Sequence, residues 1–262
     1  MDRHIVVTGA SSGIGRAVAA AFAAAGDRLL ITANRNVAGL EETAAIAGGP
    51  GRCKSFNADL SDPREARRLF DAATAWSPHL DVWVNAAGAD VLTGGGAELS
   101  FEEKLELLWA VDVRGTVLLS RLAAQHMASQ HTDAQEPSGK RRIGTPCILN
   151  VSWDQAERGI AGESGQYFGA TKAAVAAFSR SLAMTVGPAV RVNCLAPGWI
   201  RTAWGAHGAS QAWNDRAVGE SSLARWGTPE DVAAAAVWLA EPAADFINGQ
   251  VIPINGGWKP AY

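Results

Sequence analysis

The residues with the clearest chemical meaning are the glycines of a turn near the start of the chain. The segment Thr8-Gly9-Ala10-Ser11-Ser12-Gly13-Ile14-Gly15 follows a short apolar run, and an Ala-rich stretch typical of a helix comes after it. Glycines at these positions let the chain turn sharply from strand to helix and bring backbone amides close to a bound group. Amides at the start of a helix favour phosphate. The segment therefore predicts a site for the pyrophosphate of a dinucleotide.

Further motifs lie in register with this turn along the rest of the chain. They are Asn57-Ala58-Asp59-Leu60, Asn85-Ala86-Ala87-Gly88, Asn193-Cys194-Leu195-Ala196-Pro197-Gly198-Trp199-Ile200-Arg201-Thr202, Asn248-Gly249-Gln250 and Asn255-Gly256-Gly257. Together with the glycine turn they resemble the classical short-chain dehydrogenase/reductase family over essentially the full length. The resemblance implies one Rossmann-type domain that binds NAD(P)(H) across the carboxyl ends of its strands and transfers hydride.

The same resemblance implies which residues bind the cofactor. The pyrophosphate would lie over the glycine turn, the adenine beside the third strand, the nicotinamide ribose near the fourth strand and Lys172, and the nicotinamide near residues 197–202. The full expected set is Gly9, Ser11, Ser12, Gly13, Ile14, Gly15, Asn34, Arg35, Asp59, Leu60, Asn85, Ala86, Ala87, Gly88, Lys172, Pro197, Gly198, Trp199, Ile200 and Thr202.

The choice between NADP(H) and NAD(H) depends on the residues that end the second strand. Counted from Gly15, the acidic residue that would bind a ribose 2′-hydroxyl falls at Ala33, so that carboxylate is absent. Asn34 and Arg35 follow directly and can face a 2′-phosphate, although Ser12 supplies no second cation. The alternative is that Arg35 is a solvated surface charge. The sequence favours NADP(H).

The proton-transfer residues of the family are where this sequence departs from it. The family uses a tyrosine as general acid, a lysine four residues later, a serine that orients the carbonyl and an asparagine that anchors a water, because a developing alkoxide needs a proton donor. The gapless match places Lys172 on the lysine but Phe168 on the tyrosine, Trp153 on the serine and Asp112 on the asparagine. A phenyl ring cannot donate a proton.

Several neighbours are candidates to replace the missing donor. On a regular helix, residues four apart are about 40° apart around the axis and residues five apart about 140°, so a helical Tyr167 would point away from Lys172. A Tyr167 that precedes the helix would be free to reach the site, and the loop 153–166 is longer than usual for the family. Ser152, Asp154 and Asp112 are the other candidates. Asp112 can pair with Lys172 and relay protons through water.

The chain has 10 tryptophans, and several fall in segments that would border the active-site mouth. Flat indole walls suit ring-shaped substrates and exclude water. The expected substrate pocket consists of Trp153, Phe168, Trp199, Trp204 and Trp213, with Trp258 also near the mouth. Core packing is expected for Trp83, Trp109 and Trp238. The substrate is therefore expected to be apolar or aromatic.

Short apolar runs alternate with longer amphipathic or Ala-rich stretches, as in βαβ units around a parallel sheet. The expected strands are residues 5–7, 29–32, 52–57, 82–85, 147–152, 190–195 and 250–254. The expected helices are residues 15–25, 62–75, 101–130, 169–186 and 229–239. The pattern predicts an α/β, doubly wound Rossmann-type fold, with a parallel sheet of about seven strands covered by helices on both faces. A single domain is expected over residues 1–262, with a surface insertion at 131–146 and a substrate lid at 200–222.

The composition excludes several function classes. The 262 residues include 23 basic and 26 acidic side chains, and the net charge of −3 gives no basic field for nucleic acid or a membrane surface. No apolar run is long enough to cross a membrane and no signal-peptide pattern precedes the first strand, so a cytoplasmic protein is expected. The cysteines and histidines lack metal-ligand spacing, so no metal site is expected. They are Cys53, Cys147, Cys194, His4, His79, His126, His131 and His207.

Three functions remain open from the sequence. The first is an NADP(H)-dependent oxidoreductase that acts on a carbonyl, alcohol, imine or activated C=C of a small hydrophobic molecule, with a non-standard proton donor. The second is a catalytically silent relative that binds nucleotide or ligand as partner of an active homologue in a mixed oligomer. The third is non-redox isomerase or lyase chemistry with Asp112 or Asp154 as base. The resemblance also implies a homodimer or homotetramer through the helices at 101–130 and 169–186.

Overall fold

A single parallel sheet organises the computed structural model, which describes residues 3–133 and 144–260. The strands run in the order β3-β2-β1-β4-β5-β6-β7, and every neighbouring pair is parallel. They are β1 (His4–Thr8), β2 (Arg28–Ala33), β3 (Cys53–Asn57), β4 (Val82–Asn85), β5 (Cys147–Val151), β6 (Arg191–Pro197) and β7 (Val251–Ile254). The predicted Rossmann-type sheet is confirmed.

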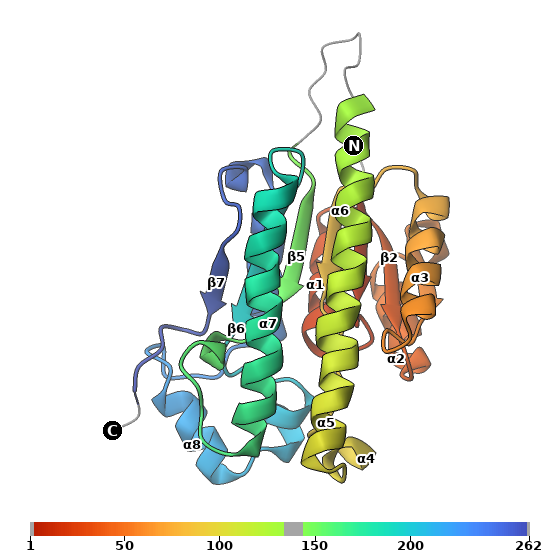
Figure 1. The fold of residues 1–262 in the computed structure, drawn as a ribbon. Helices are drawn as coiled ribbons and strands as arrows, with labels where there is room; N and C mark the ends of the chain where they lie inside the picture. The colour runs from red at the N-terminus through yellow and green to blue at the C-terminus, as the bar shows by residue number, and fades with distance from the viewer. Residues whose placement is uncertain (1–2, 134–143, 261–262) are drawn as a thin grey trace.

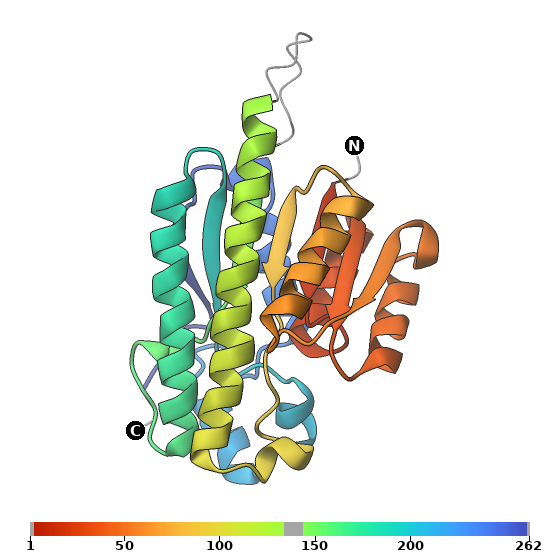
Figure 2. The same ribbon diagram turned by 45° about the vertical axis from the view of Figure 1, so that its right-hand side comes forward.

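Helices cover both faces of this sheet (Figures 1 and 2). They are α1 (Gly13–Ala24), α2 (Val37–Ile46), α3 (Pro63–Trp76), α4 (Gly94–Ala97), α5 (Phe101–Leu108), α6 (Thr116–Asp133), α7 (Glu163–Val186), α8 (Gln211–Gly219) and α9 (Pro229–Leu239). In both views α6 and α7 lie side by side across one face, and α4 and α8 lie at the end of the molecule to which the strand arrows point.

Alternation along the strands divides the core into two layers. Ile5 and Val7 of β1 pack on the side of α1 and α9, whereas Val6 between them packs on the side of α3 and α6. Successive side chains of a strand point to opposite faces, so a strand covered on both sides must be apolar throughout. This explains the uniform rather than alternating apolar runs in the sequence.

The order of the strands places a crevice at one end of the sheet. The chain moves outward from β1 to β2 and β3, and then returns to the other side of β1 as β4. The loops that leave β1 and β4 therefore diverge at the carboxyl ends of the strands, and ligands bind at such a switch point. The Thr8 hydroxyl holds the two loops together by accepting the amides of Ala86 and Ala87.

Several predicted elements differ from the structure. The expected helix at 101–130 is α5 and α6 joined by a π-helical turn (Trp109–Gly115), and α7 begins at Glu163, six residues before the expected start. The helix α2 was not predicted, because its Ala-rich, glycine-containing sequence has little amphipathic pattern. Most of the predicted insertion at 131–146 lies outside the described residues.

The tryptophans expected in the core also differ. Trp83 is fully buried, but Trp109 and Trp238 are half exposed, with 50% and 47% of their surface accessible. Their helices are apolar on several sides, so the pattern alone does not show which side faces the core. The three cysteines are buried and unpaired, and burial raises the pKa of each thiol to about 11.

The described residues include no helix that is long and apolar enough to cross a membrane. Among the same residues, no cluster of His, Cys, Asp and Glu side chains is able to hold a metal ion.

The capping box of α9 gives a prediction for stability. Asp231 accepts hydrogen bonds from both terminal nitrogens of Arg225 and from the Thr228 amide, and these hold its pKa at about 2. A carboxyl whose pKa is lower in the folded state stabilises that state above its ordinary pKa. That stabilisation is lost as the pH falls from about 4 towards 2.

We expect Asp231→Asn to lower the free energy of unfolding at pH 7 by about 1 kcal/mol, after allowance for solvent screening of this exposed pair. Urea unfolding at several pH values checks this, and the difference from the unmodified protein should narrow below pH 4. Glu230→Gln removes a neighbouring exposed carboxylate without an ion pair and is the matched control. An equal loss for both variants would contradict the prediction.

Candidate active site

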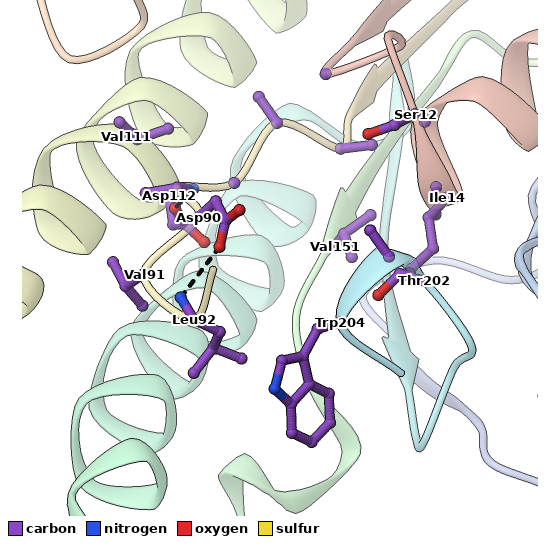
Figure 3. Close-up of a pocket in the computed structure, with 18 of the residues that line it drawn as sticks. Ser12, Ile14, Asp90, Val91, Leu92, Val111, Asp112, Val151, Thr202 and Trp204 are labelled. Carbon is purple, nitrogen blue, oxygen red and sulfur yellow. Dashed lines mark hydrogen bonds between the residues drawn. The ribbon is translucent and has the colours of Figure 1, made fainter. Parts of the chain in front are cut away.

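A cavity of about 910 Å³ opens at the carboxyl ends of the strands. The glycine turn after β1, the loop after β4, the end of β5, helix α7 and the segment after β6 all contribute to its lining. Figure 3 shows Ser12 and Ile14 on one side of it, Asp90 and Asp112 on another, and Trp204 projecting into the space between them. Residues far apart in the sequence therefore face one cavity.

The geometry of the glycine turn fits a bound pyrophosphate. Gly9 has a φ of +67°, and a Cβ there would lie 2.6 Å from the Cα of Ala87. A Cβ at Gly15 would lie 2.2 Å from the Gly9 carbonyl oxygen. Ser12 caps α1 without a side-chain hydrogen bond, and the first turn of that helix carries no acidic residue. Its first amides are thus left for an external anion.

The far end of the cavity carries a cation where the ribose of an adenosine would lie. Asn34, Arg35, Asp59 and Leu60 line this end. Arg35 is exposed and forms no ion pair with any residue that the structure describes. Burial works to raise the pKa of Asp59, but hydrogen bonds from Ser61 and the charge of Arg35 outweigh it and hold that pKa below its ordinary value.

Nearly all of the residues expected to bind the cofactor lie along this cavity, and Asn85 is the exception. Asn85 is buried, and its amide donates to the Ser120 hydroxyl and to the side-chain oxygen of Asn150. It also accepts from the indole of Trp83. The end of β4 turns this side chain into the sheet, so it does not line the cavity, and its place near the nicotinamide ribose stays a prediction.

A buried ion pair lies in the middle of the cavity. The Nζ of Lys172 lies 2.8 Å from Oδ2 of Asp112, and the Asp112 side chain is only 2% exposed. Asp112 also accepts the amide of Ala89, and Lys172 donates to the carbonyl of Val151 at 3.4 Å. The π-helical turn places Asp112 here; such turns are often found at functional sites. The carboxylate thus fixes the ammonium at the cavity wall.

Four indoles form a continuous wall on the other side, which we call the tryptophan wall (Trp199, Trp204, Trp213 and Trp226). All four line the cavity, and each ring centroid lies within 6.4 Å of a neighbour's. The wall is held from behind by Glu220, whose carboxylate accepts the Trp199 indole N–H at 2.7 Å. Trp204 and Trp213 belong to the predicted lid segment.

The comparisons with known proteins agree with this architecture. Residues 9–259 match the sequence model of a family described as "Enoyl-(Acyl carrier protein) reductase". The chain belongs to the short-chain dehydrogenase/reductase family. It is therefore an oxidoreductase of the NAD(P)-dependent type.

Two of the relatives of this short-chain dehydrogenase/reductase are named as ketoacyl reductases. It is 35% identical over 254 residues to the granaticin polyketide synthase putative ketoacyl reductase 2 of Streptomyces violaceoruber, covering 96% of this chain and 94% of the relative. It is 34% identical over 263 residues to the rhamnolipids biosynthesis 3-oxoacyl-[acyl-carrier-protein] reductase of Pseudomonas aeruginosa, covering 98% and 96%.

Solved structures share the fold of this reductase. The 3-ketoacyl-(acyl-carrier-protein) reductase of Brucella melitensis, complexed with NADH, has a TM-score of 0.81 at 28% identity, with 97% of each chain covered. A short-chain dehydrogenase of Burkholderia cenocepacia in complex with NADP has the same TM-score, identity and coverage.

The cavity of this short-chain dehydrogenase/reductase has apolar rings at two of its departures from the family. Phe168 and Trp153 both line it, with ring centroids 6.2 Å apart. Phe168 precedes Lys172 by four residues on α7 and so shares its side of the helix. The structure thus places a phenyl ring beside the lysine, at the position that the sequence match assigned to the family's tyrosine.

Two of the predicted substitutes for the donor, Tyr167 and Asp154, do not line the cavity. Tyr167 is helical, only 3% exposed, and packs with Val91 and Leu108 rather than lining the cavity. Burial and the charge of Glu163 raise its pKa, the opposite of what a proton-transferring phenol beside a lysine requires. Because α7 already includes this residue, its side chain points away from Lys172.

The side chains of Ser152 and Asp154 form hydrogen bonds with other parts of the protein. The Ser152 hydroxyl lies at the cavity but donates to the Lys172 carbonyl at 2.7 Å. Asp154 does not line the cavity; its Oδ2 accepts hydrogen bonds from Arg158 and Asn255, and burial raises its pKa. Of the two, only Ser152 is at the cavity, and its catalytic role stays a prediction. Trp258 likewise does not line the cavity, since it packs under Arg158 at the surface.

The lining residues that sequence reasoning missed include Trp226 and Asp90. Trp226 lies beyond the predicted lid, and only its contacts with Trp199 and Trp204 reveal its role. Asp90 follows the Asn85-Ala86-Ala87-Gly88 motif by two residues, and its proximity to the end of β4 was the available signal.

Proposed function

We propose that the protein uses NADPH to reduce the C=N or conjugated C=C bond of a small aromatic substrate, with no tyrosine as proton donor. The observation that supports this most directly is that one cavity joins the glycine turn, Lys172 and the tryptophan wall. The cofactor, when bound, supplies the hydride. The chain supplies position, an apolar surface and a water-poor environment, which suffice for hydride transfer to an activated acceptor.

Each group at the reacting end has a separate role in this proposal. Lys172, fixed by Asp112, would bind the ribose hydroxyls of the cofactor and hold a proton at Nζ. Phe168 and Trp153 would exclude water from the face of the substrate. The tryptophan wall would stack against an aromatic ring, since indoles favour offset or edge contacts with other rings.

The substrate class differs from that named for the relatives. A ketoacyl group becomes an alkoxide as hydride arrives and needs a proton at that moment. Phe168 cannot donate one, and Tyr167 lies off the cavity. A protonated C=N bond becomes a neutral amine as hydride arrives, and a conjugated C=C bond moves the negative charge away from the carbon that receives the hydride. Neither therefore needs a phenol at that moment.

A preference for NADPH over NADH is part of the proposal. Ala33 leaves no carboxylate to bind a 2′-hydroxyl at the end of β2, and the exposed Arg35 guanidinium, which forms no ion pair among the described residues, is suited to a 2′-phosphate.

We therefore expect NADPH to quench the tryptophan fluorescence at lower concentration than NADH. In Arg35→Ala the Kd for NADPH should rise about tenfold, the size of effect that loss of one charge-assisted contact gives. The Kd for NADH should hardly change, and neither should respond to Arg67→Ala, which removes an exposed arginine of α3 that does not line the cavity. Equal affinities for both cofactors would refute the preference. Binding of neither would favour the catalytically silent relative.

The assembly stays a prediction. Pairing of α6 and α7 between two copies, as the family resemblance implies, would make a homodimer or homotetramer, and light scattering of the purified chain measures this directly.

A further inference from the structure

The charges that line the substrate end of the cavity do not cancel. Away from Arg35 and Asp59 at the adenosine end, the charged lining residues are Asp90, Asp112 and Lys172. Lys172 and Asp112 neutralise each other at 2.8 Å. Asp90 accepts the amides of Leu92 and Thr93 and the Thr93 hydroxyl, and it pairs with no basic side chain that the structure describes. The substrate end therefore carries one uncompensated negative charge.

This charge lies close to where reaction would occur. Asp90 directly follows Ala89, and the Ala89 amide donates to Asp112. The two acidic residues therefore belong to the same side of the cavity. In Figure 3 a dashed line joins the Asp90 carboxylate to the Leu92 amide, and Asp90, Asp112 and Trp204 all line the same cavity. Asp90 is an exposed residue, and its two backbone hydrogen bonds fix the direction in which its carboxylate points.

The opposite side of the cavity offers π surfaces. The tryptophan wall consists of indoles, the ring type that attracts cations most strongly. Trp226 is only 5% exposed and has the Arg201 guanidinium over its ring, so Trp199, Trp204 and Trp213 are the rings open to a ligand. Arg216 stacks on the Trp199 and Trp213 rings, and Glu220 neutralises it through a hydrogen bond of 2.7 Å. The cavity space between Asp90 and these rings is thus suited to a flat, positively charged group.

The absence of a phenol at position 168 also favours a positively charged substrate over a neutral one. Hydride addition to a neutral carbonyl creates an anion that must be protonated, whereas hydride addition to a cation creates a neutral product. A site with Phe168 and Trp153 at the donor positions and a carboxylate nearby would disfavour the first reaction and favour the second.

We propose that the substrate is an aromatic iminium ion, held between Asp90 and the tryptophan wall. This rests on the proposed function and specifies its substrate. The iminium carbon accepts a hydride with its two electrons from NADPH, and the π electrons of the C=N bond become the lone pair of the amine nitrogen. The products are the neutral amine and NADP⁺, and no proton is consumed.

A binding experiment tests the charge requirement independently of turnover. The probe is the N-methyl-3,4-dihydroisoquinolinium ion, added to the protein loaded with NADP⁺, with quenching of tryptophan fluorescence as the readout. We expect it to bind at least about tenfold more tightly than 1-tetralone, a neutral ketone of similar shape. Asp90→Asn keeps an acceptor for the Leu92 amide but removes the charge, and it should abolish this advantage.

The matched control is Glu103→Gln, because Glu103 is another exposed carboxylate that accepts a backbone amide, at the start of α5, and it does not line the cavity. It should leave the Kd of the cation unchanged. The Kd for NADPH and the melting temperature of Asp90→Asn should also match those of the unmodified protein. Tighter or equal binding of the ketone would overturn the inference.

The turnover experiment separates this inference from the proposed function. Oxidation of NADPH is followed with cyclic iminium ions of one to three fused rings and with ketones and enones on the same skeletons, each corrected for the rate without protein. Reduction of the cations, with kcat/KM lowered about tenfold or more by Asp90→Asn, supports the inference. Reduction of neutral enones at equal or higher kcat/KM overturns it and leaves the proposed function standing. Tight NADPH binding with no reduction of any compound overturns both.

Discussion

Phe168→Tyr is expected to make the protein a reductase of neutral aromatic ketones, with kcat/KM for these compounds rising by about 10²-fold or more. The change adds one hydroxyl to a ring that already lines the cavity four residues before Lys172. A phenol there would lie beside the ammonium that Asp112 fixes, and a neighbouring positive charge lowers the pKa of a phenol. The variant would then protonate the alkoxide that the unmodified site leaves unprotonated.

The measurement is NADPH oxidation with 1-tetralone and related ketones, for the single variant and for Phe168→Tyr with Trp153→Ser. The second change restores a hydroxyl at the position that orients the carbonyl in the family and should add to the gain. Tyr167→Phe is the control, because that phenol packs with Val91 and Leu108 and should contribute nothing to reduction. A loss of activity in Tyr167→Phe would show that the proton comes from the residue that the structure places off the cavity.

Lys172→Met should abolish NADPH binding and also destabilise the fold by about 3 kcal/mol. The loss of binding follows from the removal of the ammonium at the cavity wall. The loss of stability follows because the Asp112 side chain, 2% exposed, would remain buried without its counter-charge. Cofactor titration and urea unfolding measure the two effects separately.

A second substitution separates the two roles of Lys172. In Lys172→Met with Asp112→Asn, the buried charge is gone and the amide oxygen can still accept the Ala89 amide. We expect most of the stability to return while NADPH binding remains lost. If the double variant bound NADPH normally, Lys172 would be a structural partner of Asp112 and nothing more.

The fold follows from the sequence because its signals are local and repeated. Each strand is a short apolar run that must be covered on both faces, and Thr228 with Pro229 marks the start of α9 in the expected place. Helix α7 lacks such a signal. Its first residue follows Gly162, which has a φ of +100° and makes no side-chain cap, so the sequence does not show that the helix already includes Tyr167.

Site residues could be predicted where the backbone geometry requires one residue type. They were predicted less well where residues distant in the sequence come into contact only through the fold. Gly9 and Gly15 have no room for a Cβ, so these positions require glycine and can be recognised in the sequence. The pairing of Lys172 with Asp112 was expected as an alternative, and the structure places the two in contact. The π-helical turn that carries Asp112 and the meeting of Trp226 with Trp199 depend on tertiary packing and have no comparable sequence signal.

The tryptophan wall has an optical consequence. Neighbouring indoles whose planes are tilted by 53° to 72° couple their electronic transitions, and such coupling gives rise to circular dichroism that an isolated ring lacks. Trp204 and Trp213 belong to the segment that follows β6, whereas Trp226 lies beyond α8, so a displacement of this segment would change the coupled signal. The protein therefore contains its own unlabelled reporter of cavity shape, and opening or closing can be followed without an attached probe.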